Sequence, residues 1–125
     1  MEVGDESPFT ATSARCDSGE VLITLRGELD IASAQTLRAL LAAPDAQAPT
    51  IVLDLRAVDF IDSSGLSAII TRQKEAEHAG ERLVVATGGA LQVQRLIALT
   101  GLDDVLEVVD HPDEVIGRQE PTDRV

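Results

Sequence analysis

Apolar clusters alternate with turn residues through the middle of this chain, and the clusters differ in their spacing. Short runs rich in Val, Ile and Leu predict β-strands, whereas apolar residues three or four positions apart predict α-helices. The runs that predict strands cover residues 12–16, 21–26, 50–55, 82–87 and 105–109. Asp17, Ser18 and Gly19 form a turn signal between the first two runs, which therefore predict an antiparallel hairpin. The nearly continuous apolar run 50–55 is typical of a strand covered on both faces.

Four segments carry helical spacing or helix boundary signals. The first segment is bounded by Asp30 and Pro44, and the second begins at Ser63 or Ser64 and ends at Gly80. The third lies between Gly88-Gly89 and Gly101, and the fourth runs from Pro112 to Ile116. Asp30 is expected to act as an N-cap, and Gly80 suits a left-handed C-cap. The apolar residues at helical spacing are Ile31, Ala34, Leu37, Leu41, Leu66, Ile69, Ile70, Leu91, Val93, Leu96, Ile97 and Leu99.

The order of these elements, β-β-α-β-α-β-α-β-α, predicts a single α/β domain. Strands separated by helices pair in parallel through crossover connections, so we expect a mixed, mainly parallel sheet with an N-terminal antiparallel strand and about four helices. The expected boundaries are a flexible N-terminal arm over 1–11, the domain over 12–117 and a flexible tail over 118–125. We expect one core to contain Leu53, Leu66, Ile69 and Val84, with a loop over 54–62 at the sheet edge.

The charge of the chain narrows the classes of partner. Its 125 residues include 22 Asp and Glu against 10 Lys and Arg, a formal net charge of −12. Nucleic acids and anionic membranes bind through Lys and Arg, so neither is expected as a partner. A protein partner should present a basic surface, although solubility alone also explains the acidity. No apolar run approaches the roughly 20 residues of a membrane helix, and the acidic start lacks a secretory signal, so a cytoplasmic protein is expected.

Most catalytic and metal-binding chemistries lack the residues that they need. His78 and His111 lie outside any cluster at metal-ligand spacing, and the single cysteine, Cys16, cannot form an internal disulfide. Ser63-Ser64-Gly65 lacks the preceding glycine of a nucleophile elbow, and no phosphate-binding loop occurs. Asp54 ends a predicted strand, as in a phosphorylated receiver domain, but no lysine lies in or after the last predicted strand. We therefore expect no enzymatic activity, no cofactor and no metal.

The segment 58–70 carries the most informative chemistry. Asp62 and Ser63 lie at the predicted N-terminus of a helix, where backbone N–H groups are unpaired and the helix dipole is positive. A serine there can cap the helix, and a phosphoserine can accept the same N–H groups with more charge. Gly65 gives the backbone room in the first turn, where a partner could approach. These residues by themselves leave both an ordinary helix cap and a phosphorylation site open.

The same segment resembles a family signature. Phe60-Ile61-Asp62-Ser63-Ser64-Gly65-Leu66 is similar to the D-S-[ST]-G-L signature of the STAS domain, named for sulphate transporters and anti-sigma factor antagonists. Gly27-Glu28-Leu29-Asp30 resembles the family element G-[ED]-[LV]-D, and 51–55 resembles the apolar strand before the signature. Residues 96–102 resemble the R-[LV]-[LF]-x-x-[ST]-G-[LF] stretch. The resemblance covers about residues 12–117 and implies a STAS-like fold.

The resemblance also implies a function and a site. In this family the first serine after the aspartate, here Ser63, is phosphorylated by an anti-sigma factor that is also a GHKL-type serine kinase. The unphosphorylated protein binds that anti-sigma factor and frees its sigma factor; phosphorylation blocks binding, and a PP2C-type phosphatase restores it. The implied phosphosite-flanking and partner-binding residues are Asp30, Asp62, Ser64, Gly65, Leu66 and Ser67. The predicted function is an anti-sigma factor antagonist that works by partner switching and is itself no enzyme.

A second function stays open, a STAS scaffold or accessory module, of the stressosome type or linked to a transporter, without a phosphoswitch. A free-standing domain with a target serine and an acidic neighbour favours the antagonist. Two departures from the family pattern occur. Gly88-Gly89 stands where many antagonists have Ser-Pro or Asn-Pro, and Ser67 replaces a common Gly, Arg or Ala. Neither departure changes the phosphosite, but Ser67 lies on the helix expected to face the partner.

Overall fold

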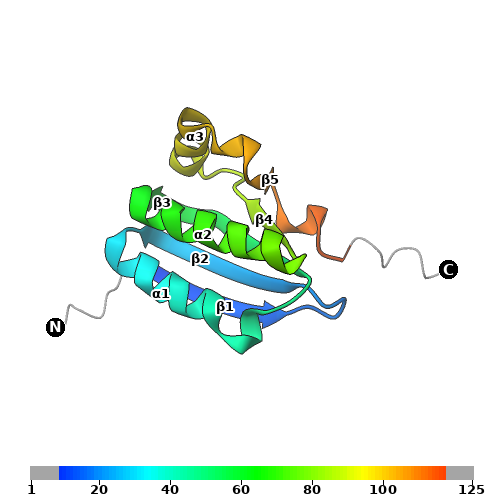
Figure 1. Ribbon diagram of the computed structural model, residues 1–125. Helices are drawn as coiled ribbons and strands as arrows, with labels where there is room; N and C mark the ends of the chain where they lie inside the picture. The colour runs from blue at the N-terminus through cyan, green and yellow to red at the C-terminus, as the bar shows by residue number, and fades with distance from the viewer. Residues whose placement is uncertain (1–8, 118–125) are drawn as a thin grey trace.

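The structure is a computed structural model that describes residues 9–117 (Figure 1). These residues form five strands, three α-helices and three short 3-10 helices. The strands are β1 (Phe9–Arg15), β2 (Val21–Leu29), β3 (Thr50–Ile61), β4 (Arg82–Ala86) and β5 (Glu107–Val109). The α-helices are α1 (Ile31–Ala42), α2 (Ser63–Ala79) and α3 (Leu91–Thr100), and the 3-10 helices are η2 (Pro44–Ala46), η3 (Leu102–Asp104) and η4 (Pro112–Glu114).

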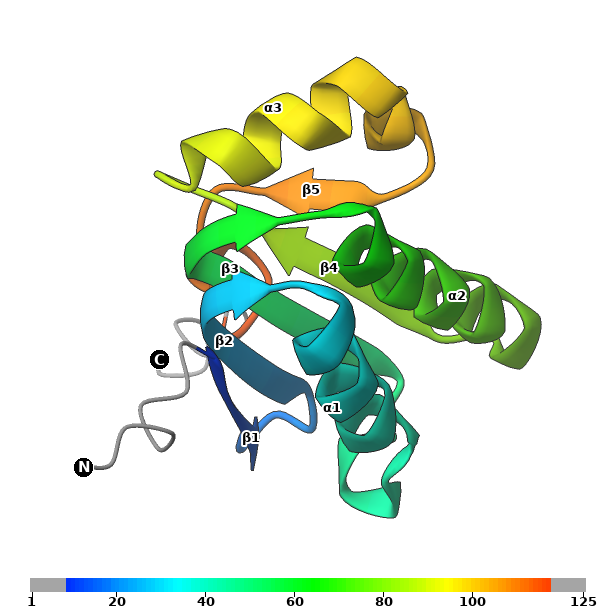
Figure 2. The same ribbon diagram turned by 90° about the vertical axis from the view of Figure 1, so that its left-hand side faces the viewer.

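The strands form one sheet in the order β1-β2-β3-β4-β5. The β1–β2 pair is antiparallel and the other three pairs are parallel, which confirms the predicted mixed, mainly parallel sheet. Helices α1 and α2 lie side by side on one face of the sheet, and α3 lies along the β5 edge (Figure 2). The carboxyl ends of β2 and β3 therefore lead directly into the helices that cover the sheet.

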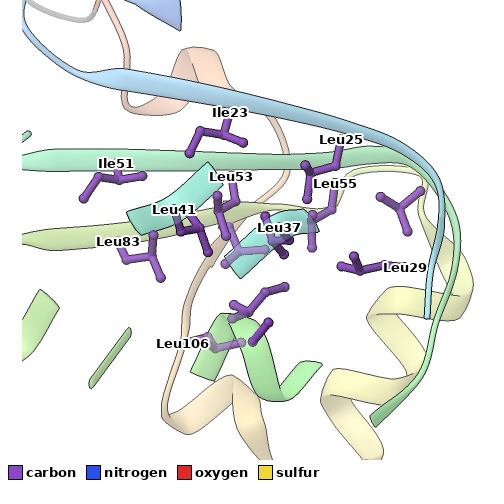
Figure 3. Packing of buried hydrophobic residues seen from close by; sticks show 14 of the residues in the cluster. Ile23, Leu25, Leu29, Leu37, Leu41, Ile51, Leu53, Leu55, Leu83 and Leu106 are labelled. Carbon is purple, nitrogen blue, oxygen red and sulfur yellow. The ribbon is translucent and has the colours of Figure 1, made fainter. Parts of the chain in front are cut away.

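The main core fills the space between the sheet and the helices (Figure 3). Alternate residues of β2 and β3 face it, so that Ile23 and Leu53 are fully buried against Leu37 and Leu41 of α1 and their neighbours. Each such Leu or Ile contributes about 1.5–3 kcal/mol through removal of its side chain from water. A chain with only two aromatic residues thus builds its core from aliphatic side chains.

The opposite face of the sheet is buried near its centre as well. Val52 and Val84 are fully buried yet lie outside the main core cluster, and the buried residues of this face alternate along the strands with those that face the helices. The helix η4 contacts β3, and its Pro112 is buried. Asp54, also buried, is bound by Arg56, whose Nε and Nη2 each lie 2.9 Å from a carboxylate oxygen.

Val84 therefore does not share the core of Leu53, Leu66 and Ile69, as the sequence led us to expect. Leu83 and Val85 face the main core instead. Because residues 83–86 are all buried, the pattern of apolar residues carried no information about which of them faces the helices.

Several element boundaries differ from those predicted. The described residues hold three α-helices and not about four, because 112–116 forms only the single 3-10 turn η4. Residues 54–61 of the expected loop belong to β3, which stays paired to β2 through two register shifts and ends at the pair Leu29 and Ile61. The strand β1 begins at Phe9, three residues before the predicted domain start. The rest of the predicted arm, and the predicted tail, lie outside the described residues.

Candidate functional site

The carboxyl ends of β2 and β3 lie side by side, and a helix begins at each. Leu29 is paired with Ile61 at the end of this parallel ladder, and the N–H of Asp62 donates to the C=O of Leu29 at 3.2 Å. Asp30 and Asp62 therefore occupy equivalent positions, one residue beyond the last pair. Both are helix N-caps, so two carboxylates and the positive ends of two helix dipoles meet at this edge of the sheet.

Asp30 caps α1 through a capping box with Ser33, as predicted. Its Oδ1 accepts hydrogen bonds from the N–H groups of Ala32 and Ser33, both at 3.1 Å, and its own N–H donates to the Ser33 hydroxyl at 2.9 Å. The hydrogen bonds from Ser33, the backbone N–H first and then the hydroxyl, hold the pKa of Asp30 below its usual value. The first carboxylate of the edge is thus an ionised and firmly held cap.

Asp62, and not Ser63, caps α2. Its Oδ1 accepts hydrogen bonds from the N–H of Ser64 at 2.9 Å and of Gly65 at 3.1 Å. Ser63 is the first residue of the helix and is exposed. Its hydroxyl makes no hydrogen bond within the part of the chain that the structure describes. The capping role that the sequence left open for Ser63 therefore belongs to its neighbour, and the hydroxyl is accessible from solvent.

The other predicted site residues on α2 divide into two groups. Ser67 is exposed and Ser64 is half-buried, so both can be reached from outside. Gly65 and Leu66 are buried and point into the fold. The signature thus combines residues that a partner can touch with residues that hold the first turn of α2 against the sheet.

Gln92 of α3 reaches the same edge, and sequence analysis missed it. Its Oε1 accepts a hydrogen bond from the N–H of Ile61 at 2.8 Å, and its Nε2 donates to the C=O of Ile61 at 3.0 Å. A glutamine in the first turn of a predicted helix gives no signal that it will bind a strand thirty-one positions earlier. Only the placement of α3 beside the end of β3 brings the two residues together.

Two exposed apolar side chains lie close to these strand ends in the chain, and a third is adjacent to Gln92. Ile31 and Leu91 are the first residues of α1 and α3 and are 67% and 70% exposed, and Phe60, two residues before Asp62, is 42% exposed. Helical spacing had placed Ile31 and Leu91 among the apolar positions of their helices, but the apolar stripe does not extend to the first residue.

The chemistry that these groups can perform is limited. No cluster of three or more His, Cys, Asp or Glu within residues 9–117 is placed to hold a metal ion. The Asp62 carboxylate accepts hydrogen bonds from two N–H groups of its own helix. Within residues 9–117 it forms no hydrogen bond with the Ser63 hydroxyl. The edge presents the exposed hydroxyl of Ser63 beside the carboxylate that caps the helix. Across residues 9–117, no helix is both long and apolar enough to span a membrane.

Comparisons with known proteins agree with this architecture. The STAS domain family matches residues 11–115. An anti-sigma F factor antagonist of Paenibacillus polymyxa is 32% identical over 95 residues, which cover 74% of this chain and 80% of that protein. An anti-sigma-B factor antagonist of Bacillus subtilis (strain 168) is 26% identical over 99 residues, covering 74% and 84%. The crystal structure of an anti-sigma factor antagonist from Mycobacterium paratuberculosis superposes with a TM-score of 0.70 at 29% identity, covering 85% of this chain and 89% of that one.

Proposed function

The chain belongs to the STAS domain family, and from this membership we propose that it is an anti-sigma factor antagonist of the cytoplasm. In this proposal the protein binds an anti-sigma factor that is also a GHKL-type serine kinase, and thereby frees a sigma factor. The kinase phosphorylates Ser63 and ends the binding, and a PP2C-type phosphatase restores it. The protein is the substrate of these enzymes and performs no catalysis itself.

One observation carries the phosphoswitch: Ser63 stands exposed at the first position of α2 while Asp62 performs the capping. A serine that capped the helix would have its hydroxyl bound to backbone N–H groups, and its modification would disturb the fold. Ser63 does not cap the helix. A kinase can therefore reach the hydroxyl without unfolding the first turn, and a phosphate on it would lie near the positive end of the helix dipole.

The electrostatics of the edge favour a loss of binding on phosphorylation. A phosphoserine adds about −1.5 to −2 charges, and it would do so next to Asp62 and near Asp30 across the β2–β3 pair. A partner that fits the acidic edge must bring basic groups and an apolar patch for Phe60. A bulky, solvated dianion at the centre of that contact separates the two surfaces. Coupled switches of this kind change binding by about 1–3 kcal/mol, or roughly 5–150-fold.

The test combines labelling with binding. The wild-type protein, Ser63→Ala and Ser64→Ala are each incubated with the cognate anti-sigma kinase and ATP, and intact mass is measured. We expect wild type and Ser64→Ala to gain one phosphate and Ser63→Ala to gain none, while Ser63→Ala keeps its affinity for the anti-sigma factor. Undiminished phosphate on Ser63→Ala would contradict the assignment. A wild-type protein that binds no anti-sigma factor would instead support the scaffold or accessory module.

A further inference from the structure

We propose that Gln92 is a positioning residue for the phosphorylation of Ser63, and that it acts by pairing with the end of β3 where no strand is present to do so. The inference rests on the proposed function, since it concerns the same site. Its basis is independent of any resemblance: one side-chain amide forms two hydrogen bonds with the backbone of one residue, Ile61.

The carboxyl end of β3 extends beyond β4, its neighbour on one side. Pairing with β4 ends at Asp54 and Ala86, whereas pairing with β2 continues to Leu29 and Ile61. In a parallel ladder the N–H and C=O of one residue point to the same side, and those of the next residue point to the other. Because the N–H of Asp62 donates to Leu29 of β2, the backbone groups of Ile61 point away from β2.

Gln92 takes the place of a continuation of β4, in which two residues of the parallel strand would bind these two groups. Its carbonyl oxygen accepts from the Ile61 N–H and its amide nitrogen donates to the Ile61 C=O, as a neighbouring strand does with its own amide groups. Ile61 is only 1% exposed, so these two groups are shielded from bulk water while Gln92 is in place. Without Gln92, both groups would lose their partners, and the strand end would have to move or open to water to regain them.

Such a movement would displace Ser63. Ile61 is followed directly by Asp62, whose carboxylate sets the first turn of α2, and then by Ser63. Phosphoryl transfer depends on an in-line arrangement of the attacking hydroxyl and the transferred group, and small displacements of a reacting atom reduce its rate strongly. Loss of Gln92 should therefore affect the chemical step more than the association of the two proteins.

Gln94 provides a matched control on the same helix. Its Nε2 donates to the C=O of Thr87 at 2.8 Å, so it too binds a backbone carbonyl, but it makes no hydrogen bond with β3 among the described residues. Gln92→Ala and Gln94→Ala remove the same atoms at two positions of one helix, on either side of Val93. Only the first variant disconnects α3 from Ile61.

The experiment has one arm with the kinase and one without it. In the free protein, hydrogen exchange followed by NMR should show the Ile61 N–H exchanging at least about tenfold faster in Gln92→Ala, with no change in Gln94→Ala. With the cognate kinase and ATP, kcat for Ser63 phosphorylation should fall about tenfold or more in Gln92→Ala, with KM within about twofold. Gln94→Ala should keep both values within about twofold. A role in folding alone would not produce this division between kcat and KM.

Failure of the inference can be told from failure of the proposed function. If wild type is labelled and Gln92→Ala has an unchanged kcat, Gln92 does not position Ser63 and the phosphoswitch stands. If wild type is not labelled at all, the proposed function is overturned, and the role in phosphorylation with it. Should Gln92→Ala not fold, Gln92→Glu replaces it, since its ionised side chain keeps an acceptor for the Ile61 N–H but has no donor for the C=O. A kcat for Gln92→Glu equal to that of wild type would overturn the inference.

Discussion

The carbonyl oxygen of Leu29 and the α-carbon of Gly65 lie so close together that no side chain fits at position 65. A β-carbon there would lie 2.6 Å from the Leu29 oxygen and 2.7 Å from its Cγ. The same oxygen accepts the hydrogen bond from the N–H of Asp62. The glycine of the signature therefore sets how closely the first turn of α2 packs against the end of β2. The sequence had suggested that this glycine leaves room for a partner, but the space beside it is filled by Leu29.

Replacement of this glycine should loosen the site and the fold together. Gly65→Ala gains helix propensity of about 1 kcal/mol, but its methyl group meets a backbone oxygen that cannot move without disturbing β2. Overpacking of this kind costs about 1–3 kcal/mol, so we expect a net loss of stability. Chemical unfolding of Gly65→Ala and of the exposed control Ser67→Ala measures it, with the control expected within about 0.5 kcal/mol of wild type. A Gly65→Ala protein more stable than wild type would contradict the packing argument.

The division of labour between the first two signature residues makes a second prediction. Asp62→Ala removes the side-chain cap of α2 and should cost about 1 kcal/mol, within a usual range of about 0.5–2 kcal/mol. Ser63→Ala removes an exposed hydroxyl with no capping role and should change stability by less than about 0.5 kcal/mol. Urea unfolding of both variants separates them. If the two substitutions destabilised the protein equally, Ser63 would contribute to the helix cap as much as Asp62.

Much of the fold was predictable because its signals are local. The caps Asp30 and Gly80, the stop at Pro44 and the alternation of strands with helices each depend on a few neighbouring residues, and the structure confirms them. The extension of β3 to Ile61 was missed for the opposite reason. Exposed residues and register shifts interrupt its apolar pattern, and only its pairing with β2 shows that it is a strand.

The site was predictable to the same degree. Asp62 and Ser63 could be placed at a helix start from the sequence, but which of them forms the cap depends on one side-chain conformation. Gln92 gave no signal, because its partner Ile61 is adjacent only in the folded chain. Leu91 gave a misleading signal, since its spacing matched the apolar stripe of its helix and the structure leaves it exposed.

Phe60 should contribute to partner binding without supporting the fold. It is 42% exposed and lies two residues before Asp62. Phe60→Ala should weaken binding to the anti-sigma factor by about 1–2 kcal/mol, as for an aromatic contact residue, with a Tm close to that of wild type. Val108→Ala on β5, where the side chain is 38% exposed, is the matched control and should leave the affinity unchanged. Calorimetric titration of both variants checks this, and equal affinities for Phe60→Ala and wild type would move the partner surface elsewhere.

The pair of Asp54 and Arg56 predicts a pH-dependent loss of stability in Arg56→Ala. Burial alone would raise the pKa of Asp54, but the hydrogen bonds and charge of Arg56 outweigh it and hold that pKa below its usual value. The wild-type pair therefore stabilises the fold above the unfolded pKa of about 3.9, and this stability is lost as the pH falls through the lower folded pKa. In Arg56→Ala the backbone N–H of residue 56 still donates to Asp54, but the hydrogen bonds and charge of the guanidinium no longer offset burial.

The difference in stability between wild type and Arg56→Ala should therefore be full at neutral pH and should shrink as the pH falls below about 3.9 and through the lowered pKa of Asp54. Since Arg56 is 36% exposed and partly screened by solvent, we expect a full difference of about 1–2 kcal/mol. Arg82→Ala, which removes the more exposed pair with Glu107, should cost less than about 1 kcal/mol at neutral pH. Thermal melts across this pH range decide the matter, and a constant difference between wild type and Arg56→Ala would argue against the pairing.

Ser63→Asp should separate binding from folding. An acidic residue in the first turn of a helix is favoured by about 0.3–1 kcal/mol, which offsets repulsion from Asp62, so the Tm should stay near that of wild type. Affinity for the anti-sigma factor should fall, but less than on phosphorylation, because one carboxylate carries less charge and fewer acceptor oxygens than a phosphate. Titrations and melts of Ser63→Asp and Ser63→Ala, run in parallel, test both halves. If Ser63→Asp loses binding together with its Tm, the effect comes from the fold and not from charge at the interface. If its affinity equals that of Ser63→Ala, a negative charge at this position does not oppose the partner, and the electrostatic account of the switch is wrong.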